Sequence, residues 1–239
     1  MLRGIMQLSS DYPPPTQIPA PMPIYKMPIC RIELAIQCLI DGQLSTLLVR
    51  RQASPYQGYW ALPGGVIRLD LDTDLDQAAK RVARERLTSS PPNLRQLVVV
   101  GAAGRDPRGA HAWGLSVIYR ALLAESPRAL GLGKRVAEIK WVPSDGLPSR
   151  MAFDHATLVR DAINTTREEI TNLKFPVGFA PKRFTLGELQ SLCEAVLGQR
   201  LDKASFRRKL IDRHLVEPIA GKVVRGNAHR PALIYRLKG

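Results

Sequence analysis

The sequence predicts an α+β fold in two parts, residues 29–173 and residues 174–239, preceded by a proline-rich arm over residues 1–28. Three observations support this division. Seven prolines fall within the arm, where they remove backbone donors and favour a flexible, extended chain. Apolar runs of strand length and two helix patterns fill the middle part. Two closely spaced helix patterns and a hairpin pattern fill the last part.

The net charge of the chain is large and unevenly distributed. The formal net charge is +14 over 239 residues. Residues 174–239 carry 14 Lys and Arg against 5 Asp and Glu, whereas the first 173 residues carry 21 against 16. A basic surface of this kind favours a polyanionic partner, and nucleic acid is the commonest one.

Hydropathy and cysteine content indicate a cytoplasmic protein without a membrane partner. No apolar run approaches the roughly 18 to 20 residues that a membrane span needs. No long apolar segment precedes the first prolines, which argues against a secretory signal. Cys30, Cys38 and Cys193 form no C-x-x-C pair and are most simply buried thiols in a reducing compartment.

The middle part begins with two apolar strands, which extend from about residue 32 to Arg51 around a turn at Asp41-Gly42. Arg51 ends the second strand and is expected to point toward the loop before Trp60. Further strands are expected over residues 94–103, over L-S-V-I-Y-R-A-L-L-A after Trp113, and at I-K-W-V-P.

The central feature of this part is the stretch from Trp60 to Leu87. It combines an aromatic residue, a Pro-Gly-Gly turn, an acidic loop and a helix. Asp74 is a plausible N-cap for the helix. A single apolar stripe predicts the helix and contains Leu75, Ala78, Ala79 and Val82.

This stretch resembles the signature loop and helix of the Nudix hydrolases. In that family a Gly-Gly turn leads into a helix of R-E-x-x-E-E type, whose carboxylates hold divalent metal against a pyrophosphate. Aligning the Arg of this pattern on Arg81 places Val82, Glu85 and Arg86 where the hydrolases have Glu. The resemblance therefore implies a Nudix α/β/α sandwich that keeps the ligand cleft. The altered carboxylates predict that the chain is not an enzyme and does not require Mg²⁺.

The loop between the turn and the helix also departs from the hydrolase pattern. It is two residues longer than usual, and the upstream Glu of the family is either replaced by Thr73 or displaced among Asp70, Asp72 and Asp74. A working Nudix pyrophosphatase, whose basic tail would serve localisation or RNA binding, is the alternative. That alternative requires Glu85 and the loop aspartates to bind Mg²⁺ despite Arg86.

Two later phrases provide candidate ligand contacts. R-D-P-R-G places Arg105 and Arg108 on a loop, where planar charged donors suit phosphate, although an exposed turn with its own Arg-Asp pair is the simpler interpretation. L-P-S-R-M-A-F-D-H opens a helix with Asp154 and His155 in its first turn. A capping or core-packed histidine is more frequent than a ligand-binding one.

The C-terminal part is predicted to be a winged helix-turn-helix. Thr185 and Glu188 form a capping box for a first helix that ends at Gly198. A second helix, over residues 202–214, buries Phe206 and Leu210, with Ile211 as a further candidate. Two strands around a Gly-Asn loop complete the motif, and the second helix is sized for a DNA major groove.

The basic residues of this part are the candidate DNA contacts. The alternative is a solvated helix face, which is what most charge runs are. Clustering on the second helix and on the hairpin tip, where Lys222 and His229 also lie, favours contact with DNA. The expected contacts are Lys203, Ser205, Arg207, Arg208, Lys209, Arg225 and Arg230.

Six phrases of the sequence, taken in order, are similar to those of the Nudix-related transcriptional regulators of bacterial NAD metabolism. They are W-A-L-P-G-G, R-D-P-R-G, L-P-S-R-M-A-F-D-H, F-T-L-G-E-L-Q, D-K-A-S-F-R-R-K-L and R-P-A-L-I-Y-R-L. The resemblance implies a homodimeric repressor that binds palindromic double-stranded operator DNA and senses ADP-ribose or a related nucleotide. A regulator of the same architecture that answers to another effector, such as a sugar or sugar phosphate, is a further alternative.

The effector cleft is expected to use arginines for the pyrophosphate and aromatic residues as walls or stacking partners for adenine or ribose. The expected ligand-binding residues are Arg51, Trp60, Arg105, Asp106, Arg108, Phe153, Asp154 and His155.

Overall fold

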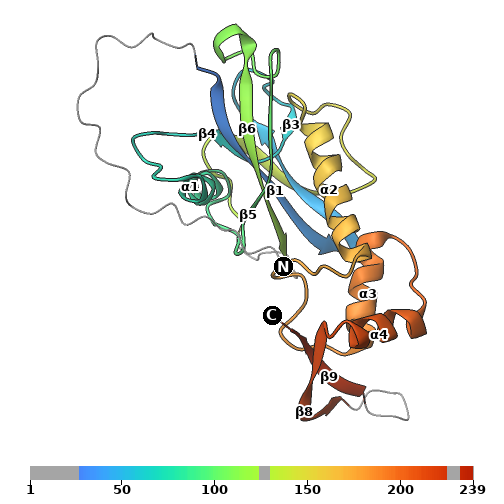
Figure 1. The fold of residues 1–239 in the computed structure, drawn as a ribbon. Helices are drawn as coiled ribbons and strands as arrows, with labels where there is room; N and C mark the ends of the chain where they lie inside the picture. The colour runs from blue at the N-terminus through green and yellow to red at the C-terminus, as the bar shows by residue number, and fades with distance from the viewer. Residues whose placement is uncertain (1–26, 124–129, 225–231, 239) are drawn as a thin grey trace.

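The computed structural model describes residues 27–123, 130–224 and 232–238 (Figure 1). The predicted flexible arm, apart from its last two residues, lies outside this range. The larger part contains one seven-stranded mixed sheet, in which β1 pairs in parallel with β6 and antiparallel with β2. Its strands are β1 (Ile29–Ile40), β2 (Gln43–Arg51), β3 (Trp60–Ala61), β4 (Gly64–Val66), β5 (Arg95–Ala102), β6 (Gly114–Leu123) and β7 (Val136–Pro143).

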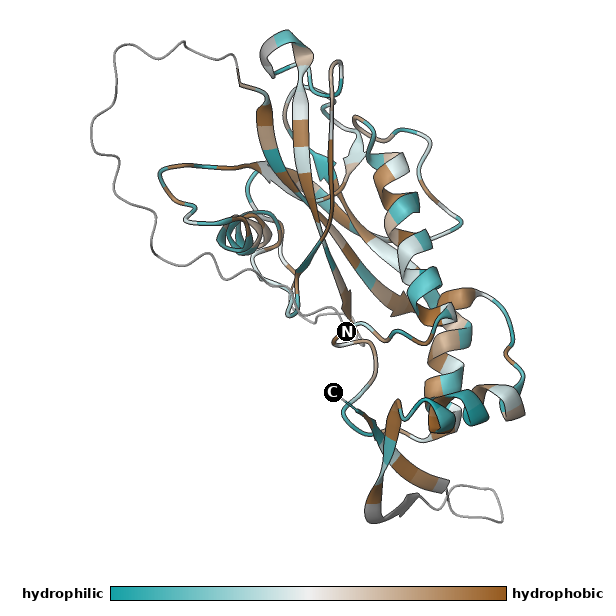
Figure 2. Ribbon diagram, viewed as in Figure 1, coloured by the Kyte–Doolittle hydropathy of each residue, from teal (hydrophilic) through white to brown (hydrophobic). Residues whose placement is uncertain are grey.

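Two helices cover the two faces of the sheet, α1 (Leu75–Leu87) and α2 (His155–Thr171). Successive side chains of a strand point to opposite faces. Ile32 and Leu34 of β1 therefore pack in one cluster with Val82 of α1, whereas Ala35 packs in another cluster with Val159 of α2. Figure 2 shows α1 turning its hydrophobic side toward the sheet. This arrangement confirms the predicted α/β/α sandwich.

The C-terminal part is a helix pair followed by a two-stranded hairpin. It consists of α3 (Leu186–Leu197), α4 (Lys203–Asp212), β8 (Val216–Val224) and β9 (Ala232–Leu237). The predicted capping box is present, because Thr185 and Glu188 each bond the other's backbone N–H. Gly198 ends α3 with φ of 70°, a conformation that favours glycine. The winged helix-turn-helix is therefore confirmed.

The short helix α4 departs from its predicted packing at one position. Phe206 and Leu210 are buried as expected, but the side chain of Ile211 is 51% exposed. Ile211 follows Leu210 by one residue, which rotates it about 100° away from the buried stripe of the helix. Ile211, the further candidate for burial, therefore lies on the exposed side of the helix.

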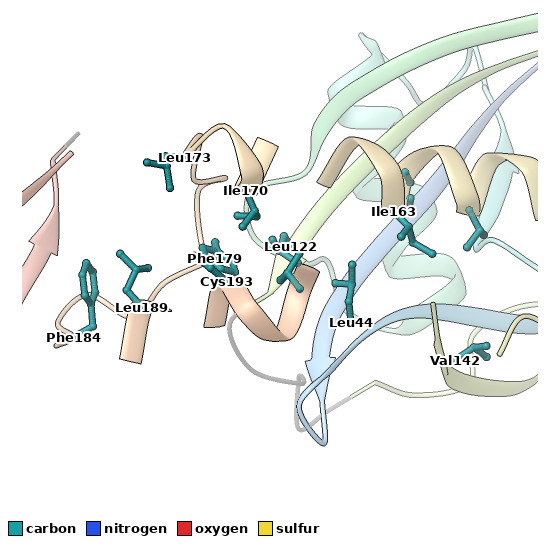
Figure 3. Close-up of a cluster of buried hydrophobic side chains, with 14 of the residues drawn as sticks. Leu44, Leu122, Val142, Ile163, Ile170, Leu173, Phe179, Phe184, Leu189 and Cys193 are labelled. Atoms are coloured by element: carbon teal, nitrogen blue, oxygen red, sulfur yellow. The ribbon is translucent and has the colours of Figure 1, made fainter. Parts of the chain in front are cut away.

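One hydrophobic cluster joins the two parts of the chain. Figure 3 shows Leu44 and Leu122 of the sheet in the same cluster as Ile163 of α2, and Leu189 and Cys193 of α3 extend it. The end of α2 therefore packs against α3, which lies beyond one end of the sheet in Figure 1. The boundary expected between residues 173 and 174 stays a prediction, because the cluster continues across it.

The cysteines lie mostly in the interior. Cys38 and Cys193 are buried and Cys30 is partly buried. Burial raises the pKa of the Cys193 thiol to about 12, so that this thiol is protonated at neutral pH. No helix among the described residues has both the length and the apolar character needed to cross a membrane.

Between β5 and β6 lies the single-turn 3-10 helix η1 (Ala110–Ala112), in the loop that contains R-D-P-R-G. This loop brings Arg105 and Arg108 to the N-terminal end of α2, where Asp154 and Phe153 lie. Two of the phrases that the sequence singled out therefore meet in space, although about 45 residues separate them in the chain.

Candidate functional site

A cavity of about 340 Å³ opens beside the Pro-Gly-Gly turn, between β2, the second half of α1 and the start of β7. Its wall is strongly cationic. The charged side chains that line it are Arg31, Arg51, Arg68, Arg81, Arg86, Arg108, Lys134 and Arg135, with Glu85 as the one lining acid among the described residues. Such a concave surface of one sign concentrates anions.

The turn requires glycine because the chain segments around it approach closely. A Cβ on Gly64 would lie 1.7 Å from a carboxylate oxygen of Glu33, and a Cβ on Gly65 would lie 2.9 Å from Val82 of α1. A larger residue at either position would have to displace the Glu33 carboxylate or Val82. The Gly-Gly pair therefore lets the turn lie close to both side chains at the edge of the cavity.

Arg51 is the sequence-predicted residue with the clearest position in the cavity wall. Its guanidinium donates to the carbonyl oxygens of Pro55 (2.9 Å) and Ala53 (3.3 Å), so it points toward the loop before Trp60, as predicted. Burial, and then repulsion from Arg108, lowers its pKa to about 10. Arg51 therefore stays charged at neutral pH, and a bound anion would relieve the repulsion.

Phe153 lies behind Arg51 and Arg108. Each guanidinium carbon is 5.2 Å from the centre of the Phe153 ring, within the range of a cation–π interaction. Tyr56 packs edge-on against the same ring, with 4.6 Å between ring centres. The φ of Phe153 is 54°, an uncommon backbone conformation for a bulky residue. The ring therefore orders two cavity arginines.

Arg105, Asp106 and Asp154 support the site from outside the cavity wall. Arg105 donates to both carboxylate oxygens of Asp154, at 2.6 and 3.0 Å, and to the hydroxyl of Ser116. The carboxylate of Asp106 is buried and accepts two bonds from the guanidinium of Arg108, at 2.8 and 2.6 Å. The structure thus places Arg108 on the cavity and holds Arg105 in an internal ion pair.

His155 and Trp60 do not line the cavity. His155 is 2% exposed, and its Nδ1 accepts a hydrogen bond from the backbone N–H of Leu62 at 2.9 Å. Burial lowers the pKa of His155, so the ring is neutral and carries its proton on Nε2, which faces Glu33 at 3.7 Å. Trp60 packs against the hydrophobic cluster and its backbone bonds the segment before α2. Both residues position the turn.

Most acidic side chains of the Nudix-like stretch pair with arginines or with the backbone, and Asp76 accepts a hydrogen bond from the hydroxyl of Tyr119. Arg81 forms two bonds to Asp72, at 2.6 and 2.7 Å, and lies 3.3 Å from Glu85. Hydrogen bonding from Arg81 holds the pKa of Asp72 below its usual range. Asp70 pairs with Arg68, and Asp74 caps α1 through the backbone N–H of Gln77, as predicted.

The surviving carboxylates do not form a metal site in the part of the chain that the structure describes. No group of three or more His, Cys, Asp or Glu side chains with a suitable arrangement occurs there. Mg²⁺ prefers several oxygen ligands in octahedral geometry. Glu85 provides one carboxylate, which already faces Arg81, so these residues do not fit the metal that Nudix hydrolases use.

The second candidate surface is the exposed side of α4. Lys203, Arg208 and Lys209 are exposed, whereas Ser205 and Arg207 are partly buried. The Nε atom of Arg207 is buried without a hydrogen-bond partner among the described residues. Arg225 and Arg230, predicted at the hairpin tip, lie outside the described residues.

Comparison with known proteins identifies the family. A model of the NUDIX domain family matches residues 33–162, and a model of the NrtR DNA-binding winged helix domain matches residues 176–237. The ADPR responsive transcriptional repressor NtrR of Acinetobacter baylyi is 34% identical over 213 residues, which are 89% of this chain and 83% of that protein. The chain belongs to the NrtR family of Nudix-related regulators.

Solved structures of another NrtR family member are similar to this chain. The crystal structure of Shewanella oneidensis NrtR complexed with a 27mer DNA has a TM-score of 0.69 at 32% identity, over 87% of this chain and 93% of that chain. The structure of the NUDIX domain of the same protein complexed with ADP ribose has a TM-score of 0.54 at 34% identity, over 59% of this chain and 90% of that chain.

One relative is an enzyme. The ADP-ribose pyrophosphatase of Methanocaldococcus jannaschii is 28% identical over 128 residues, which are 54% of this chain and 71% of that protein. The similarity therefore covers about half of the chain.

Several residues that line the cavity of this chain were not among the ligand contacts predicted from its sequence. Arg31 lies in β1, where its spacing of two from Glu33 signals a same-face ion pair. Lys134 and Arg135 belong to G-L-G-K-R, a basic loop that none of the quoted motifs includes. Arg86 was noted as a departure from the hydrolase pattern, but not as a ligand contact.

Proposed function

We propose that this chain is a DNA-binding transcriptional repressor whose Nudix domain senses ADP-ribose. Membership of the NrtR family supports this function. Similarity to the Acinetobacter relative, an ADPR responsive transcriptional repressor, supports it further. So do the Shewanella structures, one with DNA and one with ADP ribose.

The observation that carries the proposal is the cationic cavity beside the Gly-Gly turn. Arg51 and Arg108 face it as planar donors, and guanidinium groups match phosphoryl oxygens in pairs. A diphosphate carries negative charge that would balance these arginines, whereas a neutral sugar would leave their positive charge unbalanced. This chemistry favours ADP-ribose over a neutral sugar.

The Nudix domain is proposed to bind its effector without hydrolysing it. Hydrolysis in the family depends on carboxylates that hold divalent metal. Val82 is buried in the hydrophobic cluster, Glu85 faces Arg81, and Arg86 occupies the remaining position. The assay is release of AMP from ADP-ribose with Mg²⁺ or Mn²⁺. Robust turnover that is abolished by Glu85→Gln would establish the pyrophosphatase alternative instead.

The repressor is proposed to act as a homodimer on a palindromic operator near genes of NAD synthesis or salvage. A single short helix such as α4 contacts few bases in one half-site, so two-fold symmetry provides useful specificity. Sedimentation of the free protein and of its DNA complex tests the stoichiometry. One protomer per operator would contradict the dimer.

The test of the function is calorimetry with ADP-ribose, NAD and a panel of sugars, repeated with operator DNA present. We expect ADP-ribose to bind more tightly than the sugars. We also expect its affinity to fall when DNA is bound, because binding free energies of two coupled ligands are reciprocal. Equal affinity with and without DNA would contradict effector control.

A further inference from the structure

Arg86 is held in a fixed position at the cavity. It lies in the last turn of α1, and its Nε donates to the carbonyl oxygen of Gly64 at 2.7 Å. Its Nη1 donates to the carbonyl oxygen of Lys134 at 2.6 Å. Its Nη2 has no hydrogen-bond partner among the described residues. The side chain is therefore clamped between the Gly-Gly turn and the basic loop, with one terminal nitrogen available to a ligand.

The position of Arg86 is one at which the hydrolase pattern has a metal-binding Glu. Here the charge at that position is reversed, and the neighbouring Glu85, which also lines the cavity, lies 3.3 Å from Arg81. A divalent cation entering this cavity would meet Arg51, Arg86 and Arg108 with little carboxylate to balance them. The same three guanidinium groups are suited to binding a diphosphate.

We infer that the Arg86 guanidinium binds the effector diphosphate in the place where a Nudix hydrolase would hold its metal, so that ADP-ribose binds to this chain without divalent metal. This inference rests on the proposed function. A guanidinium neutralises and orients phosphoryl oxygens through paired N–H donors. It does not coordinate water and lower the pKa of that water, which is how a metal generates a nucleophile. The substitution therefore provides binding without cleavage.

The electrostatics of the free protein agree with this role. Burial, with further repulsion from Arg31 and Arg135, lowers the pKa of Arg86 from its ordinary value. An arginine remains charged at neutral pH in spite of such a shift. Attraction to Glu85 offsets only part of this effect, so the cavity holds a positive charge at a fixed point that a bound anion would stabilise further.

The experiment is calorimetry of ADP-ribose binding to the full chain, once in EDTA and once in Mg²⁺. Wild type is expected to bind equally well in both. Arg86→Ala is expected to lose roughly tenfold or more in affinity under both conditions, because a charge-assisted contact is removed. Arg86→Glu restores the hydrolase carboxylate and is expected to abolish binding in EDTA, with partial recovery in Mg²⁺.

Matched variants separate this role from a general charge effect. Arg84→Glu makes the same charge change on the same helix, at an exposed residue that does not line the cavity, and should bind as wild type does. Arg86→Lys keeps the charge but lacks the planar fork. It should bind with intermediate affinity and without metal, which provides a test if Arg86→Glu does not fold.

The outcomes distinguish this inference from the proposed function. Wild-type binding that is lost in EDTA would overturn the role of Arg86 and leave ADP-ribose as the effector. Undiminished binding by Arg86→Glu in EDTA would do the same. If wild type bound no ADP-ribose under either condition, the effector assignment would fail, and the role of Arg86 with it.

Discussion

At the residue scale, the effector cavity depends on arginines whose orientation is set by side chains behind them. Asp106 holds Arg108 through two hydrogen bonds, and Phe153 lies under both Arg108 and Arg51. Because these contacts exist before a ligand arrives, binding requires little ordering of the side chains. Preorganisation of this kind lowers the entropic cost of binding.

Replacing Arg51 by Ala tests the cavity directly. A hydrogen bond between charged groups contributes about 1.5–3 kcal/mol, so affinity for ADP-ribose should fall by roughly 10- to 100-fold. Calorimetry measures the change. Arg50→Ala is the control. Arg50 is the residue before Arg51 in β2, pairs with Glu138 and does not line the cavity. Similar losses in both variants would contradict the assignment of Arg51.

The buried His155 predicts a dependence of stability on pH. Burial lowers its pKa in the folded state below the ordinary value of 6.5, so the unfolded chain binds the proton more readily. The stabilisation is therefore fully present above about pH 6.5 and is lost as the pH falls toward the folded-state pKa. For one titrating group, the free energy of unfolding changes by at most about 1.4 kcal/mol per pH unit.

Urea unfolding between roughly pH 5 and 8 measures this contribution. In His155→Asn the amide oxygen can still accept the hydrogen bond from Leu62, but the side chain no longer titrates. The loss of stability on acidification should therefore be smaller in the variant than in wild type. An identical pH profile would show that His155 is not the titrating group.

At the element scale, α2 is the structural connection between effector cavity and DNA-binding part. Its first turn contacts the site through Asp154, which pairs with Arg105, and through His155. Near its other end, Arg167 donates to the carbonyl oxygen of Val196 in the last turn of α3 at 3.2 Å. A cation at the C-terminal end of a helix is favourable. A displacement of α2 would therefore reach α3.

Arg167→Ala should weaken the coupling between effector and DNA while leaving the cavity intact. Coupling of about 1–3 kcal/mol is usual, so ADP-ribose should release operator DNA less effectively from the variant than from wild type. Fluorescence anisotropy of a labelled operator measures the release. Arg160→Ala, on the exposed face of the same helix, is the control. Release from Arg167→Ala at the wild-type effector concentration would contradict a role for α2.

The exposed side of α4 gives a separate prediction for DNA binding. Arg208→Ala and Lys209→Ala should each weaken operator binding, and removing one cation that neutralises a phosphate should reduce the slope of log affinity against log salt by about 1. Lys140→Ala removes the same charge from an exposed residue of β7, in the Nudix part of the chain, and should leave the slope unchanged. Unaltered affinity in both α4 variants would remove this helix from the interface.

The elements were predictable because their signals are local. Asp74, Thr185 and Gly198 mark helix ends through hydrogen bonds and backbone angles within a few residues of each position. The cavity wall was only partly predictable, because it joins segments distant in sequence. Arg31 and Arg135 meet there through strand pairing and a loop contact that no periodicity encodes.

The same distinction explains which predicted site residues line the cavity and which do not. Arg105 and Arg108 are equivalent in the sequence, as two arginines around an Asp-Pro turn. In the structure Arg105 turns inward to Asp154, whereas Arg108 turns to the cavity. Their roles depend on the position of α2, which comes from about 45 residues further along the chain and cannot be read from the turn itself.

At the scale of the whole molecule, two binding functions share one continuous hydrophobic cluster. Leu122 of the sheet, Ile170 of α2 and Leu189 of α3 belong to it. A shared core means that rearrangement at one part changes packing at the other, because packed interiors shift between discrete arrangements rather than deform continuously. The cluster thus gives the two parts a physical route for exchange of binding free energy.

The charge distribution is consistent with two separate anion-binding surfaces, one in each part of the chain. The last 66 residues have a surplus of nine positive charges, which suits a phosphate backbone, while the cationic cavity of the first part suits a small diphosphate. Both partners are anions, so the antagonism that we propose between them needs a structural cause rather than competition for one surface. The connection through α2 and α3 provides one.

The most direct test of this account is fluorescence anisotropy of a labelled duplex that the protein itself has selected from random DNA. The bound duplex is titrated with ADP-ribose in EDTA, and the nucleotide is recovered afterwards. We predict that anisotropy falls to the value of free DNA while ADP-ribose is recovered intact. Retention of the duplex at saturating ADP-ribose, or recovery of AMP in its place, would contradict the account.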